Sequence, residues 1–186
     1  MRAVAARARI GGDDPADLGA LFERYVRPLL RYNACRVGPD AAEDVVAETF
    51  LIAHADSDRY DADRASMLTW LYGIATNVAR RHRRTESRLL VTYSRAAQID
   101  IEEGFAESAT ARADAQVARR RIARALARLP RRQRDVLLLF AVAELEYAEI
   151  AAALDIPIGS VQSSLHRARV KLRAALSAAP SSGGST

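Results

Sequence analysis

An interrupted helical pattern between residues 147 and 169 constrains the fold of this chain more than any other feature. Apolar residues recur at helical spacing before Asp155 and after Pro157, and the residues between them break that spacing. Ala151 provides the small side chain that a close helix crossing requires. A short helix, a tight turn and a second helix form a helix-turn-helix, whose second helix faces the major groove of DNA.

The second helix of this motif has a polar and basic outward face. Hydroxyl and amide groups bond base edges or phosphates, whereas Arg and Lys neutralise phosphates. An ordinary hairpin with a solvated basic face is the alternative, but the small packing residue, the turn and the basic face together favour binding to duplex DNA. The candidate contact residues are Ser160, Gln162, Ser163, Ser164, His166, Arg167 and Lys171.

The rest of the chain shows helical spacing of apolar residues and no alternating pattern of the kind that strands require. Aromatic residues make up only 6% of the composition, which also favours helices over sheets. We expect the first helix to begin at Asp14-Pro15 and the third at Ser66. The second is expected to begin at Asp40, with Glu43 three residues later completing a capping box. Later helices are expected at about 131–143, 147–154 and 159–176.

The predicted fold is therefore all-α, with two small helical domains joined by a flexible linker. An acidic, pattern-free stretch separates the two sets of helices, and both chain ends have the composition of disordered tails. The expected divisions are a tail at 1–13, a first domain at 14–88, a linker at 89–113, a helix-turn-helix domain at 114–178 and a tail at 179–186.

The second expected helix has an acidic face. Asp44 and Glu48 are four residues apart and share this face with Ala47 and Leu51. Like charges at this spacing cost a helix about 0.2–0.5 kcal/mol, and no Lys or Arg on the same helix offsets them. An acidic patch with an apolar rim suits a basic protein partner, and a plain solvated face is an equal alternative.

The third expected helix has a polar face that begins with Thr69, Gly73 and Thr76, and the helix ends in a run of arginines. Cations at a helix C-terminus complement its dipole, but this run is longer than a cap requires. Together with the loop before the helix, the face suits single-stranded DNA with an extruded base. The candidate residues are Tyr60, Arg64, Ser66, Asn77, Arg80, Arg81 and Arg84.

Other functional classes find little support in the sequence. The net charge of +5 fits a polyanionic partner. Cys35 is the single cysteine, so no intrachain disulfide forms, as is typical of a cytoplasmic protein. The three histidines lack metal-ligand spacing, and the chain has neither a phosphate-binding glycine loop nor a nucleophile–base pair. We therefore expect no metal, no cofactor, no catalytic residue, no enzyme activity and no membrane insertion.

These motifs, in this order, resemble those of extracytoplasmic-function (ECF) sigma factors, subunits of bacterial RNA polymerase. The segment Ala42-Glu-Asp-Val-Val-Ala-Glu-Thr-Phe resembles the family's polymerase-binding helix. The segment Thr69-Trp-Leu-Tyr-Gly-Ile-Ala-Thr-Asn resembles its minus-ten-reading helix. Leu129-Pro, Tyr147-Ala-Glu-Ile-Ala and Gly159-Ser-Val-Gln-Ser-Ser-Leu-His-Arg-Ala-Arg resemble its minus-thirty-five domain. The resemblance covers residues 17–88 and 114–177.

The resemblance implies that the chain binds core RNA polymerase, through its largest and second-largest subunits, and promoter DNA. Asp44, Glu48 and Leu51 would face the clamp helices of the largest subunit. Asn77 and the loop 60–66 would capture unpaired minus-ten bases, and residues 80–84 would hold the DNA backbone there. Residues 160–167 would enter the major groove at minus thirty-five. An anti-sigma protein that covers both domains is a further implied partner.

The sequence departs from the family pattern at three positions. The family often has Gln where Ala47 stands, and usually has Lys and Arg where Gln162 and Ser164 stand. The minus-thirty-five preference of relatives therefore does not transfer, and no regulatory domain is expected after the helix-turn-helix. A stand-alone helix-turn-helix regulator is the alternative function. It would need neither the acidic face of Asp44 and Glu48 nor the face around Asn77.

Overall fold

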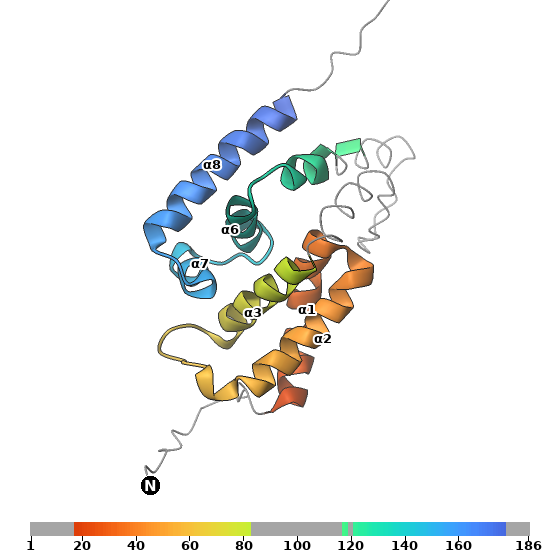
Figure 1. Ribbon diagram of the computed structural model, residues 1–186, viewed down its shortest axis with the longest axis vertical. Coiled ribbons are helices and arrows are strands. Elements are labelled where there is room, and N and C mark those ends of the chain that lie inside the picture. The colour runs from red at the N-terminus through yellow and green to blue at the C-terminus, as the bar shows by residue number, and fades with distance from the viewer. Residues whose placement is uncertain (1–16, 83–116, 119–120, 178–186) are drawn as a thin grey trace, which may run out of the picture.

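The computed structural model describes residues 17–82, 117–118 and 121–177, and every regular element within these ranges is helical (Figure 1). This confirms the all-α fold class. The expected linker at 89–113 and both expected tails lie outside the described residues. The elements are α1 (Leu18–Val37), α2 (Pro39–Ala55), a short 3-10 helix η1 (Ser57–Arg59), α3 (Met67–Arg81), α6 (Arg131–Ala141), α7 (Tyr147–Leu154) and α8 (Ile158–Ser177), with further helical residues at 121–127.

The helix starts in the first half differ in part from those expected. Helix α1 begins after Asp17, whose carboxylate accepts a hydrogen bond from the amide of Ala20 at 3.1 Å, while residues 14–15 lie outside the described part. The predicted start of α3 is confirmed, because Ser66 Oγ accepts from the amide of Thr69 at 3.2 Å. Side-chain oxygens thus cap both helices.

The predicted capping box at the start of α2 is wrong. The helix begins at Pro39, and no side chain of the described residues caps its first turn. Gly38 precedes it with a φ of 91°, a conformation that glycine adopts without steric cost, so the chain turns directly from α1 into α2. Pro39 then takes the first helical position, where its missing N–H has no partner to lose.

Helices α1, α2 and α3 pack into a first unit around buried apolar side chains such as Leu29, Phe50 and Leu71. A polar contact ties α1 to α3 inside this core: the hydroxyl groups of Tyr32 and Thr76 lie 2.7 Å apart. Burial raises the pKa of the Tyr32 phenol, so this hydroxyl stays protonated at neutral pH.

Helices α6, α7 and α8 form a second unit, and they confirm the predicted helix-turn-helix. Helix α7 has the predicted bounds, whereas α6 ends two residues earlier than expected and α8 gains one residue at each end. The turn depends on Asp155, whose φ of 52° is left-handed, and on the amide of Ile156, which donates to the carbonyl of Ala151 at 3.0 Å. Ile150, Val161 and Leu165 are fully or almost fully buried between the helices.

The two units are packed against each other. Figure 1 shows α8 on one side of α6 and α7, and α3 on their other side, followed by α1 and α2. One cluster of buried side chains includes Leu29 and Leu71 from the first unit together with Leu139 and Ile150 from the second. Helix α3 is therefore enclosed by neighbours from both units, and this placement determines which of its residues reach solvent.

We predict that Leu165→Ala lowers the free energy of unfolding by about 2–5 kcal/mol, because it leaves a cavity in the core of the second unit. Val170→Ala on the same helix is the matched control, since Val170 is 51% exposed and its truncation should change stability by less than about 0.5 kcal/mol. Urea denaturation of the full chain measures both. Equal losses for the two variants would contradict the described register of α8.

Candidate functional site

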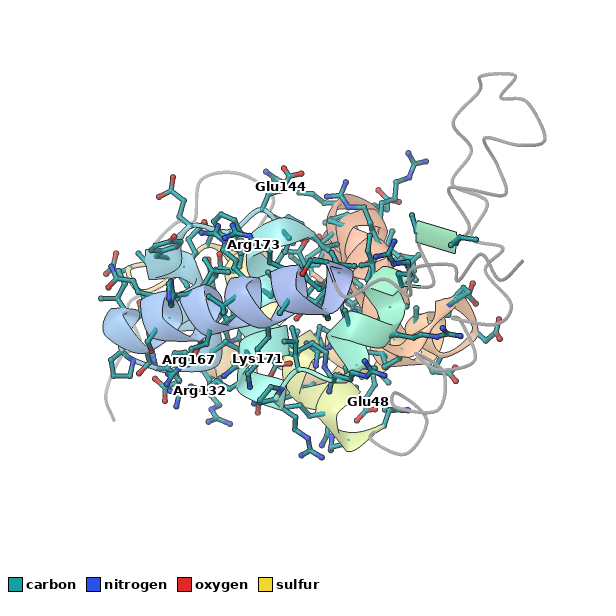
Figure 2. The ribbon with its side chains drawn as sticks, turned by 90° about the horizontal axis from the view of Figure 1, so that it is seen from above. Glu48, Arg132, Glu144, Arg167, Lys171 and Arg173 are labelled. Carbon is teal, nitrogen blue, oxygen red and sulfur yellow. The ribbon has the colours of Figure 1, made fainter. Side chains whose placement is uncertain are left out.

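Helix α8 presents a continuous polar face to solvent. The exposed members of the predicted set are Gln162, Ser163, His166, Arg167 and Lys171, and Ser160 is half-buried. Figure 2 labels Arg167 and Lys171 along one side of α8, with Arg132 from α6 on the same side of the view. Arg173 is labelled on the opposite side. The structure thus brings hydroxyl, amide and cationic groups together on a convex helical surface.

The Arg167 side chain lies along this face. Its Nε donates to the carbonyl of Ser163 at 3.1 Å, and its Nη2 donates to Ser163 Oγ at 3.0 Å. Ser163 Oγ in turn donates to the carbonyl of Ser160 at 3.3 Å. These contacts hold the guanidinium group near the N-terminal half of α8, which is the half that enters the major groove in helix-turn-helix proteins.

Ser164 is a correction to the predicted contact set. Its side chain is only 3% exposed and therefore cannot meet a base edge. The reason is its register: Ser164 follows Val161 by three residues and precedes Ala168 by four, so it shares their face. That face packs against α6 and α7.

Arg169 has a packing role that the sequence reasoning missed. Its guanidinium carbon lies 4.8 Å from the centroid of the Phe140 ring, which is a cation–π geometry. The contact fastens α8 to α6. A basic residue next to an apolar stripe was a weak signal of this role, because helical spacing alone does not reveal an aromatic partner on another helix.

The N-terminal part of the polar face of α3 is covered rather than exposed, so the expectation for Thr69, Gly73 and Thr76 is wrong. All three residues are buried. Thr69 Oγ1 donates to the Glu149 carboxylate at 3.3 Å, and a Cβ atom placed on Gly73 would lie only 2.5 Å from the carbonyl oxygen of Ala153. Helix α7 packs here because small residues on α3 permit a close approach.

Three of the arginines predicted to contact DNA are held by acidic groups. Arg80 donates to Asp135 from Nε at 3.0 Å and from Nη2 at 2.8 Å. Its Nη1 donates to Asn77 Oδ1 at 2.9 Å. Asn77 is exposed, and this hydrogen bond orients its side chain. Arg64 forms an ion pair with Asp155 in the turn of the helix-turn-helix. The third arginine is Arg81, described below, and Arg84 lies outside the described residues.

The loop before α3 borders a cavity of about 430 Å³ between the two units. The ring centroids of Tyr60 and Trp70 lie 5.2 Å apart, and this contact holds Tyr60 against α3. The Ser66 hydroxyl is engaged as the N-cap of α3. Because residues of α7 and its turn form one wall, this cavity exists only while the units are packed. Its lining includes Asp56, Arg59, Arg64, Trp70, Gly73 and Asp155.

The acidic face of α2 is only partly as predicted. Asp44, Ala47 and Leu51 are exposed, and Leu51 exposes 63% of its surface. Glu48 is half-buried, because Arg81 Nη2 from α3 donates to its carboxylate at 2.8 Å. The charge that α2 itself does not offset is therefore offset from the neighbouring helix. Figure 2 shows Glu48 beside the end of α3.

Sequence reasoning missed an ion pair in the core. Arg36 Nη1 lies 2.8 Å from Asp135 Oδ1, and each side chain is only 1% exposed. The available signal was the position of Asp135, four residues before Leu139 on the buried side of α6. An acidic residue at a core position requires a cationic partner, but the sequence does not identify that partner.

Within the described residues, no cluster of three or more histidine, cysteine or acidic side chains has the arrangement of a metal site. No described helix has the length and apolarity to cross a membrane.

Comparison with known proteins gives two family matches and a set of relatives. The family models Sigma-70 region 2 and Sigma-70 region 4 match residues 21–89 and 119–172. The chain is 31% identical to the ECF RNA polymerase sigma factor SigW of Bacillus subtilis, over 71% of this chain and 73% of the relative. It is also 31% identical to the ECF RNA polymerase sigma factor RpoE of Cereibacter sphaeroides, over 86% of each chain.

Two solved structures have a similar fold. The structure of CnrH in complex with the cytosolic domain of CnrY has a TM-score of 0.60 and 28% identity, covering 87% of this chain and 88% of that chain. The sigma factor RpoE in complex with the anti-sigma factor NepR from Bartonella quintana has a TM-score of 0.58 and 23% identity, covering 85% and 94%.

We predict that Lys171→Ala reduces the salt dependence of duplex DNA binding, lowering the slope of log K against log salt by about 0.9 for one lost phosphate contact. Arg173→Ala is the matched control, because it removes the same charge from a position about 200° further around α8. Fluorescence anisotropy of the full chain on duplex DNA over a salt series measures both slopes. Identical slopes for the two variants would show that binding does not depend on this face.

Proposed function

We propose that this chain, which belongs to the family of ECF RNA polymerase sigma factors, directs core RNA polymerase to promoters through three separate surfaces of its own. Members of this family are transcription initiation factors rather than catalysts. The observation that carries the proposal is the combination, in one chain, of an acidic and apolar face on α2, a minus-ten segment on α3 and a polar face on α8. The polymerase performs the chemistry, and this chain needs no cofactor.

The α2 face is the contact with the largest polymerase subunit. Leu51 supports this role, because it exposes 63% of its surface three residues after Glu48 and so provides the apolar contact beside the charged groups. Asp44 provides the exposed charge that orients a basic partner. Ala47 leaves the centre of this face flat, and Glu48 contributes the remaining charge from its position beside Arg81.

The α8 face is the minus-thirty-five contact. Arg167 and Lys171 neutralise phosphates, and Gln162, Ser163 and His166 are the exposed groups able to bond base edges. Ser164 is removed from this set because it is buried. Base recognition by short hydroxyl and amide groups, rather than by a bidentate Arg on guanine, is consistent with a sequence preference that differs from those of relatives.

The loop 60–66 and the C-terminal half of α3 are the minus-ten contact. Asn77 is exposed there, and the neighbouring Arg80 and Arg81 supply cations for the backbone of an unpaired strand. Tyr60 provides an aromatic surface against which a base stacks. Arg64 completes the loop as a further phosphate contact.

The chain acts in the cytoplasm and is silenced there by an anti-sigma protein. Support comes from the structural relatives, since both solved structures are complexes with a second protein, the cytosolic domain of CnrY in one case and the anti-sigma factor NepR in the other. Such a partner would cover surfaces on both units, because both units carry contacts that initiation requires.

Reconstituted transcription tests this function against the alternative of a stand-alone helix-turn-helix regulator. Purified full chain is added to core polymerase that lacks other sigma factors, on promoters mapped after overexpression. Initiation that depends on both the chain and the promoter supports the proposal. A chain that binds duplex DNA tightly but never associates with core polymerase is a regulator instead.

We predict that the double variant Asp44→Ala with Glu48→Ala weakens core binding about tenfold, a loss of roughly 1.4 kcal/mol, while the fold stays intact. Glu23→Ala is the control, since Glu23 is an exposed carboxylate on α1 and lies outside the α2 face. Titration of labelled protein with core polymerase measures the affinities. An unchanged affinity of the double variant would remove the role assigned to these carboxylates.

We predict that Asn77→Ala reduces the yield of open promoter complex several-fold while closed-complex binding stays within twofold, about 0.4 kcal/mol. The amide is expected to contact only an unpaired base, so its loss affects melting and not duplex binding. Permanganate footprinting of the minus-ten region reports opening, and a mobility-shift assay at low temperature reports closed complexes. Equal open-complex yields for Asn77→Ala and the unmodified protein would count against this role.

A further inference from the structure

Helix α3 reaches solvent along one narrow line of side chains. Asn77 and Arg81 are the exposed residues of this helix, and Trp70 and Ile74 continue the same line as half-buried residues, at steps of three or four positions. Every residue of α3 is described, so Asn77 is its one exposed neutral hydrogen-bonding group. It is therefore the group through which α3 is best placed to hydrogen-bond an unpaired base.

The Asn77 side chain is oriented by Arg80, which follows it by three residues on the same helix. Arg80 Nη1 donates to Asn77 Oδ1 at 2.9 Å. A guanidinium group has donors and no acceptor, so the amide of Asn77 turns its oxygen toward Arg80. The amide nitrogen, Nδ2, is then the group left to meet a base. Because both residues lie on α3, this hydrogen bond does not require a second helix.

Arg80 is itself held in place. Its Nε and Nη2 donate to Asp135 Oδ2 at 3.0 and 2.8 Å, and the Asp135 side chain is 1% exposed. Arg36 Nη1 lies 2.8 Å from Oδ1 of the same carboxylate, and we call these three residues, Arg36, Arg80 and Asp135, the Asp135 cluster. A guanidinium group is planar and rigid, so bonds to Nε and Nη2 also fix the direction of Nη1. Arg80 therefore offers Asn77 a donor of fixed direction.

The orientation of the amide determines which bases it recognises. A free asparagine reads adenine with both of its groups, because its oxygen accepts from the N6 amino group while its nitrogen donates to N7. In Asn77 the oxygen is already bonded to Arg80, and the group presented is a donor. Thymine has a keto oxygen at O4 and guanine has one at O6, and both accept hydrogen bonds. Adenine and cytosine have amino donors at the equivalent positions, so a donor would meet a donor there.

We infer that Arg80 is a positioning residue for Asn77, and that the resulting amide orientation selects a keto base, thymine or guanine, at the unpaired minus-ten position that Asn77 contacts. This inference rests on the proposed function, in which Asn77 meets an extruded base. An N–H group that faces an amino group leaves a polar group without a partner, which is the costly case for a hydrogen bond. We therefore expect about tenfold weaker binding of adenine and cytosine at this position, equivalent to about 1.4 kcal/mol.

Two variants change this orientation in different ways. Arg80→Lys keeps the positive charge but lacks the planar fork, so its ammonium group does not hold Asp135 and the Asn77 oxygen in the same fixed geometry. The Asn77 amide is then free to turn and to read all four bases. Asn77→Asp replaces the presented donor with an acceptor, so the preference inverts to adenine or cytosine. Because Asn77 is exposed, this second variant tests the orientation even if Arg80→Lys fails to fold.

Arg27→Lys is the matched control for Arg80→Lys. Arg27 is an exposed cation on α1, outside the three proposed surfaces, and the substitution is chemically the same. We expect this control to keep both the affinity and the base preference of the unmodified protein.

The experiment uses the full chain bound to core polymerase and a fluorescent single strand that carries the minus-ten element of a promoter mapped after overexpression. An abasic site is first moved along this strand. Asn77 contacts the position at which loss of the base weakens binding of the unmodified complex but not of the Asn77→Ala complex. Each of the four bases is then placed at that position, and anisotropy titration gives a dissociation constant for each base and each variant.

The expected result is a pattern of ratios. The unmodified protein and Arg27→Lys bind strands with thymine or guanine about tenfold more tightly than strands with adenine or cytosine, whereas Arg80→Lys binds all four within about twofold. Asn77→Asp binds the strands with adenine or cytosine more tightly than the other two.

These ratios separate a positioning role of Arg80 from a plain phosphate contact. If Arg80 only neutralised a phosphate, Arg80→Lys would change the affinity for all four bases equally and leave the keto preference intact, and that result would overturn the inference. A preference of the unmodified protein for adenine or cytosine at the Asn77 position would overturn it as well.

Failure of the proposed function gives a different result. In that case the complex with core polymerase binds no minus-ten strand, or Asn77→Ala matches the unmodified protein on every strand. Either outcome removes the role of Asn77 in the minus-ten contact, and the positioning role of Arg80 is overturned with it.

Discussion

The contact between the Asp135 carboxylate and its two arginines is the constraint on which the placement of the other functional groups depends. A carboxylate that is 1% exposed has to be neutralised where it lies, and the neutralising charges come from α1 and α3. This places α6 on the first unit and α7 on α3, which in turn explains why Thr69 and Gly73 of α3 are buried, whereas Thr76 is buried against Tyr32 of α1. Arg80 links the buried ion pair to the candidate site, because the same side chain bonds Asp135 and orients Asn77.

Much of the fold was predictable from the sequence because its signals are local. Apolar spacing located the helices, and the break at Asp155 and Pro157 located the turn, since Asp155 ends α7 in the left-handed conformation and Pro157, two residues later, directly precedes α8. The N-cap at Ser66 was equally local, because its hydrogen bond spans three residues. Most of the α8 contact set followed as well. A helix with a buried apolar stripe exposes its opposite side, and Gln162, Ser163, His166, Arg167 and Lys171 are exposed.

The remaining part of the candidate site was not predictable, because its partners are distant in the sequence. Arg81 meets Glu48 across 33 residues, and Arg80 meets Asp135 across 55 residues. Helical periodicity shows that a residue is polar and on the outer side of one helix, but it does not show whether another helix covers that side. This explains the wrong expectation for Thr69, Gly73 and Thr76. The error at Ser164 is different, because its spacing from Val161 and Ala168 already placed it on the buried stripe.

The packing of the two units leaves the three proposed surfaces unequally exposed. Asp44 and Leu51 on α2 are exposed while the units are packed, as are Arg167 and Lys171 on α8. The minus-ten segment is the surface whose arginines are held in the interface. Contacts made through α2 and α8 therefore need no prior rearrangement of the packed units. A partner that bound both units in their packed register would stabilise that register, because it would add its own binding free energy to that of the Asp135 cluster.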